Sequence, residues 1–385
     1  MTDVVIAGIG QIPVGEHWDL SLRQMAVRAI RTAITDSGGM QPQALYIGNM
    51  LSSIISHQAN LGALLSDYAG LRGIESYTVE AAGASGGGAL RMAYLAILSG
   101  YVDTAVVVGV EKWTDLVGSE VQSAVATEMD YDFEGVPGLS VTGQAGLLMQ
   151  RYLHQYKLPA DALATFPVLA HTNGVHNPNG YFQRALSRET YAAAEKVSDP
   201  LNMYDASPFA DGAAAVVLTR ADLVPAGLRH KLVNVLGSAV AIDTLALHDR
   251  VDPLAFGAVR ASLDSACRQA GVMPLYADVL ELDDSYSIYA ALSLEAGGYA
   301  EQGKAGELNL DVLSPKGKLP FLTMGGCKAR GNPIGAKGVY QAVEAALQLR
   351  GEAGANQVPD AKLAVIQCLG GPASTAVTHV LRTRE

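Results

Sequence analysis

The segment that most constrains the fold of this chain is Val79-Glu-Ala-Ala-Gly-Ala-Ser-Gly-Gly-Gly-Ala-Leu90, where an extended apolar run gives way to glycines and then to an alanine-rich helical pattern. We interpret it as a β-strand that turns sharply onto the N-terminus of a helix. Such a turn leaves backbone N–H groups without partners and directs the positive end of a helix dipole at the space in front of Gly83. The segment therefore predicts a site for a nucleophile or an anion.

Strand-like and helix-like patterns alternate along the rest of the chain. Continuous apolar runs such as Val4–Gly10 are typical of strands covered on both faces, and stretches with apolar residues at helical spacing follow them. This alternation predicts an α/β chain with a mostly parallel sheet and helices on both faces. We expect strands over residues 4–10, 44–49, 104–112, 213–218, 231–236, 278–283 and 363–368, and helices over 20–34, 59–68, 255–270 and 335–349.

The second half of the chain repeats the scheme of the first. Each half has a glycine-rich turn before a long helix: Gly83-Ala-Ser-Gly-Gly87 in one half and Gly331-Asn-Pro-Ile-Gly335 in the other. An internal duplication, with halves over residues 1–225 and 226–385, is the simplest account. Over residues 113–200 the alternation stops and the chain becomes polar and irregular, with short helices. Such excursions are more often functional than idle, so we expect this one to form part of a pocket.

Charge and composition exclude several classes of function. A formal net charge of −11 argues against general nucleic-acid binding, which needs a concentrated basic face. No apolar run is long enough to cross a bilayer and no basic-then-apolar leader opens the chain, so we expect a cytoplasmic protein with no membrane association. The cysteines, Cys267, Cys327 and Cys368, are scattered, which indicates neither a disulfide framework nor a metal site.

An ordered series of segments resembles the thiolase superfamily, especially its archaeal-type acetoacetyl-CoA thiolases. The resemblance implies a duplicated, five-layered αβαβα fold with two mixed sheets and an acyl-CoA substrate. Coenzyme A would come as part of that substrate, and no permanently bound cofactor is implied. The family also implies at least a homodimer, and a small zinc-ribbon/OB-fold partner accompanies archaeal-type members. The segments are the turn at Gly83, Gly109-Val-Glu-Lys112, Asp205-Ala-Ser-Pro-Phe-Ala-Asp-Gly212, Gly325 to Gly335 and Cys368-Leu-Gly-Gly371.

The chain departs from the family pattern at the reaction centre. The cysteine that the family acylates falls on Gly83, which has no side chain. The histidine of the Gly-His-Pro motif is replaced by Asn332. Asp283-Asp-Ser-Tyr286 stands where the family has His-Asp-Ala-Phe or Asn-Glu-Ala-Phe, and only the C-terminal cysteine remains, as Cys368. Because thiolysis needs a thiolate to hold the acyl group, ordinary thiolase activity is expected to be lost or much reduced.

The remaining groups still suggest an enolate-stabilising site. The N–H groups of Gly83 and Gly370 are expected to form an oxyanion hole, and the Asn332 amide is expected to donate to a thioester oxygen. Cys368 would then act as a base if the pKa of its thiol is lowered. Asp283 and Tyr286 are further acid–base candidates.

Each of these residues also has a structural interpretation. Cys368 at the end of an apolar strand is typical of a buried small hydrophobe, and Asn332 before a proline is an ordinary turn residue. Asp283 would cap the next helix, and Tyr286 would pack in the core. Two further groups of basic residues are candidates for a role. His171 and His176 lie in a polar, loop-like stretch, and Lys328, Arg330 and Lys337 flank the second turn, where they would meet phosphates or form a solvated face.

Three functions follow from these observations. The first is a thiolase-like enzyme that binds an acyl-CoA and makes or breaks a C–C bond through an enolate, without a cysteine acyl-enzyme. The second is a non-catalytic, thiolase-like scaffold subunit of an acyl-CoA enzyme complex. The third is an ordinary acyltransferase in which residue 83 was changed, although the altered Asn332 and Asp283 weigh against a single engineered change.

Overall fold

The structure is a computed structural model that describes residues 3–384. Nine of its strands form one mixed sheet in the order β3-β2-β4-β7-β1-β8-β11-β10-β9, and β5 pairs with β6 in a separate ribbon. The strands are β1 Val4–Gln11, β2 Ala44–Gly48, β3 Glu75–Val79, β4 Thr104–Glu111, β5 Lys196–Ser198, β6 Leu201–Asn202, β7 Gly212–Arg220, β8 Val233–Ile242, β9 Val279–Glu281, β10 Leu363–Gly370 and β11 Thr375–Thr383.

The sheet is the junction of two halves. The first half runs from β3 to β1 and the second from β8 to β9, and they meet where Val5 lies opposite Asn234 and Ile6 opposite Val233. The two sheets expected from the sequence are therefore joined edge to edge. The expectation of a mostly parallel sheet is wrong, because only β2–β3, β2–β4 and β9–β10 pair in parallel. Strands joined by a short loop, such as β10 and β11, can pair only antiparallel.

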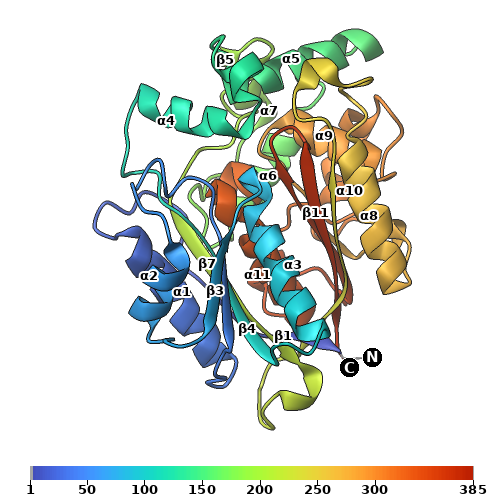
Figure 1. Cartoon of the computed structure of the whole chain (residues 1–385). Helices are drawn as coiled ribbons and strands as arrows, with labels where there is room; N and C mark the ends of the chain where they lie inside the picture. Colours follow the sequence, from blue (N-terminus) through green and yellow to red (C-terminus); the bar gives the residue numbers. More distant parts are fainter. Residues whose placement is uncertain (1–2, 385) are drawn as a thin grey trace.

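Helices complete a five-layered arrangement, which confirms the predicted fold class. α1 packs on β1, β4 and β7, and α8 packs on β8 and β11 at the opposite side of the molecule. α3 and α11 lie against each other between the two halves of the sheet (Figure 1). The helices are α1 Leu22–Asp36, α2 Leu61–Ala69, α3 Ser85–Leu98, α4 Ser119–Val125, α5 Val141–Tyr156, α6 Thr165–Gly174, α7 Arg188–Ala192, α8 Gly257–Ala270, α9 Ser287–Ala296, α10 Leu310–Leu313 and α11 Lys337–Arg350.

Burial explains why the central strands could be predicted from the sequence. β4 and β10 have no exposed residue, so each reads as a continuous apolar run rather than an alternating one. Helix ends also follow local signals. Ser21 and Gln24 form a capping box at the start of α1, and α11 ends at Gly351 with φ +83°.

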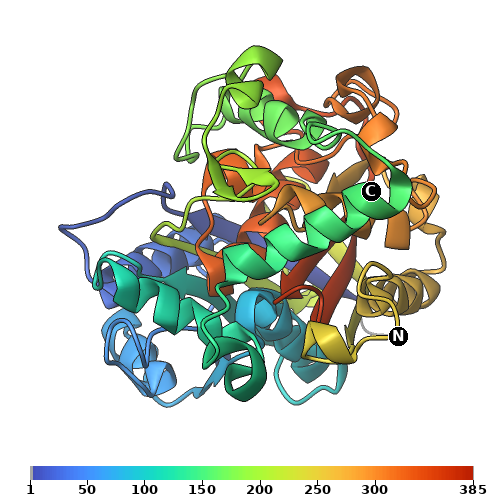
Figure 2. The same cartoon turned by 90° about the horizontal axis from the view of Figure 1, so that it is seen from above.

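The excursion over residues 113–200 folds over one end of the sheet. α4, α5, α7 and β5 gather above the strands in Figure 1, and Figure 2 shows α5 crossing the molecule when it is seen from above. The segment is more regular than its sequence indicated, since α5 has 16 residues and α6 includes His171. Within residues 3–384, no helix combines the length and the apolar character that a bilayer span requires.

Small residues let α3 and α11 approach each other closely. A Cβ on Gly87 would overlap the Cys368 Sγ, and a Cβ on Gly338 would lie 2.5 Å from the Gly87 nitrogen. Both positions therefore exclude any larger residue without a shift of the helices. This contact fixes the N-termini of the two helices beside each other.

Candidate active site

The first turn has the strand-to-helix geometry that its sequence predicts. β3 ends at Val79, a single 3₁₀ turn covers Ala82–Ala84, and α3 begins at Ser85. Ala82 takes a left-handed backbone conformation with φ +49°, which is costly for a residue with a Cβ. The Ser85 hydroxyl holds the turn, because it accepts from the Ala81 N–H at 2.9 Å and donates to the Ala82 carbonyl at 2.6 Å.

The second turn faces the first. A 3₁₀ turn over Ile334–Ala336 leads into α11, whose first residue is Lys337, and this turn packs against the Ala82–Ala84 turn. Two helix N-termini therefore converge on one place. Their dipoles and free N–H groups favour negative charge there.

Lys337 occupies the space that a side chain at position 83 would fill. A Cβ on Gly83 would lie 2.6 Å from the Lys337 Nζ and 2.5 Å from the Leu369 carbonyl oxygen. Gly83 itself has no side chain, and a buried ammonium group from the opposite turn fills the space in front of it. Lys337 is only 4% exposed.

Lys337 is held by an ion pair with Asp283. Its Nζ lies 2.5 Å from the Asp283 Oδ2 and 3.2 Å from the Ser285 Oγ. Burial is the largest single influence and would lower the pKa of Lys337, but the charge and hydrogen bond of Asp283, together with Cys327 and Glu128, hold that pKa above its ordinary value. Burial would likewise raise the pKa of Asp283, but Lys337 and the hydrogen bonds from Ser285 keep it below its ordinary value. Both groups are therefore charged at neutral pH.

Asp283 also reaches the main chain of β10. Its Oδ2 accepts from the Leu369 N–H at 3.1 Å and its Oδ1 from the Ser285 N–H at 3.0 Å. This aspartate is an interior ion-pair partner rather than the cap of α9, whose N-cap is Tyr286.

Asn332 lies between the serines of two separate segments. Its Nδ2 donates to the Ser207 Oγ at 3.0 Å and approaches the Ser285 Oγ at 3.5 Å. The residue is 2% exposed, and its Oδ1 has no hydrogen-bond partner in the described structure. A buried amide oxygen without a partner costs free energy unless a ligand supplies a donor.

Glu128 is a carboxyl group near this ion pair that the sequence did not single out. Burial raises its pKa to about 7, Lys337 opposes the rise, and Asp283 adds to it. Its side chain is therefore poised to exchange a proton at neutral pH. It lies in the 3₁₀ turn over Ala126–Glu128 that follows α4, in the segment that folds over the sheet.

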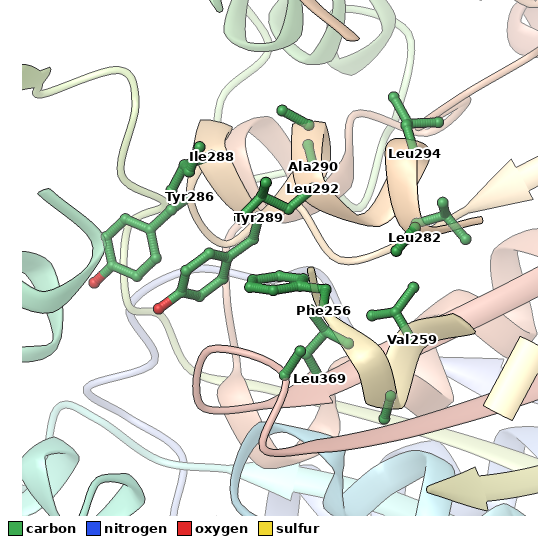
Figure 3. Close-up of a cluster of buried hydrophobic side chains, with 14 of the residues drawn as sticks. Phe256, Val259, Leu282, Tyr286, Ile288, Tyr289, Ala290, Leu292, Leu294 and Leu369 are labelled. Carbon is green, nitrogen blue, oxygen red and sulfur yellow. The ribbon is translucent and has the colours of Figure 1, made fainter. Parts of the chain in front are cut away.

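Two tyrosines border the same region. Figure 3 shows the hydroxyls of Tyr286 and Tyr289 pointing to the same side, away from the apolar cluster around Phe256 and Leu282. The Tyr286 hydroxyl lies 3.0 Å from the Thr142 Oγ1, and burial raises the pKa of both phenols, so both stay protonated. The centroids of their rings lie 5.1 Å apart. Each tyrosine therefore combines core packing with an inward-facing hydroxyl group.

Cys368 and Gly370 lie to one side of the ion pair. The Cys368 thiol is 1% exposed, packs with Ala84 and Val377, and points at the Ala84 carbonyl oxygen at 3.7 Å. Burial raises its pKa to about 12, which does not suit a base at neutral pH. Gly370 lies against the other side of the first turn, where an added Cβ would sit 2.5 Å from the Ala81 carbonyl oxygen. The roles assigned to both residues, and to the Gly83 N–H, stay predictions.

The other basic residues of the second turn do not form a solvated face. Lys328 and Arg330 are each 1% exposed, and Arg330 pairs with Glu344 at 2.6 Å. Asp284 accepts from the Cys327 and Lys328 N–H groups and so holds the turn over Gly326–Arg330. Arg330 and Asp284 therefore stabilise the turn that precedes Asn332, and in this way they support the site.

Sequence reasoning missed Lys337 as a central residue, although a signal was present. A glycine where a turn normally carries a side chain leaves a space, and close-packed interiors do not leave such a space empty. The residue that fills it must come from a facing segment. The second glycine-rich turn was the obvious candidate.

Comparisons with known proteins agree with the fold. Residues 4–222 match the family model described as "Thiolase, N-terminal domain", and residues 239–383 match "Thiolase C-terminal domain-like". The chain is 38% identical over 383 residues to an acetyl-CoA acetyltransferase of Methanothermobacter thermautotrophicus, covering 99% of each chain. It therefore belongs to the thiolase family.

Two further relatives extend the comparison. The benzoylsuccinyl-CoA thiolase subunit BbsB of Thauera aromatica is 28% identical, over 96% of this chain and 94% of its own length. The solved Ltp2-ChsH2(DUF35) aldolase superposes with a TM-score of 0.84 at 21% identity, over 99% of this chain and 98% of that one. At that identity the superposition shows the shared fold alone.

Proposed function

We propose that this protein is a thiolase-family enzyme that breaks or forms a C–C bond next to an acyl-CoA thioester, through an enolate and without a cysteine acyl-enzyme. The observation that carries the proposal is the buried Lys337–Asp283 pair in the space of the missing nucleophile. A buried ion pair is a poor way to stabilise a core, because apolar residues of similar size fill a space at lower cost. Its presence at this position favours chemistry over scaffolding.

The charges suit a developing enolate. In the cleavage direction, the Glu128 carboxylate accepts the proton of a 3-hydroxyl group on the acyl chain. The Cα–Cβ bond then breaks, its electron pair moves onto the thioester as an enolate, and the β-carbon leaves as an aldehyde or ketone. The Lys337 ammonium and the two helix N-termini stabilise the enolate oxygen, and the proton returns to Cα to give the shortened acyl-CoA.

A cavity beside α5 offers a path for the coenzyme A arm. It has a volume of about 430 Å³ and lies between α5, the π-helical turn over Tyr131–Gly135 and the turn over Leu247–Asp249. Leucine side chains line it, and Arg151 and His248 supply basic groups for phosphates. α5 also carries Thr142, which reaches Tyr286, so this helix connects the cavity to the site.

The names of relatives support the substrate class. The Methanothermobacter relative is an acetyl-CoA acetyltransferase, and the protein with the closely superposing fold is an aldolase. A thiolase-fold chain named as a subunit, BbsB, supports the prediction of a partner subunit. A cytoplasmic location and a homodimer also stay predictions.

The test compares two reactions of the purified protein. We expect cleavage of short-chain 3-hydroxyacyl-CoA esters, followed as release of acetyl-CoA and carbonyl product, with no acyl adduct in the intact mass. Lys337→Met should abolish cleavage, whereas Lys316→Met, an exposed control, should not. Thiolysis of acetoacetyl-CoA with an acyl adduct would overturn the proposal, and failure to bind any CoA ester would favour the scaffold.

A further inference from the structure

A second cavity lies beside Ser207, the hydrogen-bond partner of Asn332. Its volume is about 480 Å³, and it opens between α6 and the loops on either side of α7. Ser207 and Lys328 contribute to its wall, and Arg184 and Met203 are exposed wall residues. The mechanism proposed above does not use this cavity.

The cavity is basic in a protein that is acidic overall. Lys328 is 1% exposed, and within residues 3–384 its Nζ donates to a single partner, the Asp205 carbonyl oxygen at 2.6 Å. An ammonium group has three donors, so two remain for a ligand. Arg184 has no carboxylate partner in the described part of the chain, and none of the side chains that line the cavity is acidic. The side chains that line the cavity therefore offer an anionic group cationic donors, although the carboxylates of Asp284 and Asp205 also act on Lys328 from outside the wall.

Aromatic rings form another part of the wall. His171 stacks on Phe182 with centroids 5.7 Å apart and meets Tyr204 edge-on at the same distance. Burial lowers the pKa of His171, so the ring is neutral at pH 7. Its Nδ1 contacts the Arg184 carbonyl oxygen at 3.2 Å and must donate to it. The cavity therefore combines an apolar, aromatic wall with cationic donors.

A continuous chain of polar side chains joins this cavity to the ion pair. Ser207 in the cavity wall accepts from Asn332, Asn332 approaches Ser285, and the Ser285 Oγ contacts the Lys337 Nζ. Because the Ser207 Oγ accepts here, its own proton is available to a group in the cavity. The unpartnered Oδ1 of Asn332 lies on this chain.

We infer that this cavity binds a carboxylate carried by the acyl part of the substrate. The inference rests on the proposed function and names its substrate class: acyl-CoA esters whose acyl group ends in a carboxylate. Arg184, Lys328 and the Ser207 hydroxyl hold the carboxylate, and the aromatic wall holds the carbon chain. The thioester then lies on the Lys337 side of Asn332, with coenzyme A leaving past α5.

A matched pair of ligands tests this inference without any turnover. Glutaryl-CoA and valeryl-CoA have acyl chains of equal length and differ in the terminal carboxylate. Calorimetry on the full chain should show that glutaryl-CoA binds about tenfold more tightly, the effect expected of charge-assisted hydrogen bonds. Arg184→Gln, an exposed change, should reduce this preference to about threefold or less, and Lys328→Met should remove it.

Arg151→Gln is the matched control, because it changes an arginine in the α5 cavity. It should weaken both esters equally and leave the preference intact. Equal binding of the two esters by the unaltered protein would overturn the inference. So would an equal loss for both esters in Arg184→Gln, because that result would assign the cavity to coenzyme A phosphates. If the protein prefers the carboxylate ester but cleaves no 3-hydroxyacyl-CoA, the proposed reaction is wrong and the proposed carboxylate site is still supported.

Discussion

At the scale of single residues, Lys337 and Asp283 form an ion pair that water hardly reaches. Removal of one partner leaves the other buried and uncompensated. We expect Lys337→Met to lower the free energy of unfolding by about 3–5 kcal/mol, measured by urea denaturation. The double variant with Asp283→Asn should recover part of that loss. An unchanged unfolding midpoint in the single variant would contradict the ion pair.

Glu128 predicts a specific pH dependence. Burial raises its pKa to about 7, and the base must be ionised, so cleavage should fall as pH drops through 7. The same shift acts on stability in the opposite direction. The folded protein binds a proton that the unfolded chain has lost, so this contribution is full in acid and disappears as pH rises through 7. Rate profiles of Glu128→Gln and of the exposed control Glu120→Gln separate this carboxyl from others: only the first should lose the inflection.

A cysteine introduced at position 83 should not by itself give the protein thiolase activity. Its Cβ would lie 2.6 Å from the Lys337 Nζ and 2.5 Å from the Leu369 carbonyl oxygen. Gly83→Cys alone is therefore expected to lower the melting temperature and to give no acetyl adduct with acetyl-CoA. Gly83→Cys combined with Lys337→Ser removes the lysine contact and leaves only the Leu369 carbonyl contact to be relieved by a shift of the turn, so it should give the adduct, detected by intact mass. An adduct in the single variant would show that Lys337 moves aside easily.

The sequence predicted which motifs meet but not which atoms fill the site. Gly83, Asn332 and Asp283 do converge, because motifs at turns before helices are placed by the elements around them. The direction of a long side chain such as Lys337 depends on the empty volume beside it, which no local pattern reports. Glu128 was not predicted as a site residue for the same reason. Its burial arises because its segment folds over the sheet, and no local pattern reports that.

At the scale of elements, α3 and α11 meet where Gly87 and Gly338 enclose the Cys368 thiol. Gly87→Ala would overlap that thiol, and we expect it to cost about 1–3 kcal/mol in urea denaturation. Cys368→Ala in the same chain should relieve most of this cost. Gly88→Ala on the same helix is the control, because its Cβ would meet only the Val79 Cγ1, at 3.1 Å. If Cys368→Ala brings no relief, the thiol is not the obstacle.

Element positions were predicted well where burial is uniform and poorly elsewhere. β4, β7 and β10 lie within a few residues of their predicted bounds, because strands covered on both faces leave continuous apolar runs. Only short helices were expected within the polar stretch, so the length of α5 and the helical position of His171 in α6 were not predicted, since their contacts come from distant segments. Strand direction was also misjudged, because alternation of strands and helices does not reveal the antiparallel return of β7 between β4 and β1.

At the scale of the whole molecule, β3 is an open sheet edge with apolar groups around it. Tyr77 is 61% exposed, Met92 and Leu95 on the adjoining α3 are 45% and 40% exposed, and Tyr101 is 77% exposed. Exposed edges that carry apolar side chains favour association with another copy. We expect a homodimer by light scattering, and Tyr77→Glu should shift it toward monomer.

The control for the dimer is Tyr276→Glu, which changes an equally exposed tyrosine in the second half of the chain. It should leave the measured mass unchanged. A dimer that survives Tyr77→Glu would place the interface elsewhere.

The shared space between position 83 and Lys337 has a consequence for related sequences. A side chain at position 83 and a lysine at position 337 compete for the same volume, so a cysteine at the first position and a lysine at the second exclude each other. Relatives that carry a cysteine at the position of Gly83 are therefore expected to carry a small residue at the position of Lys337, and a survey of related sequences checks this.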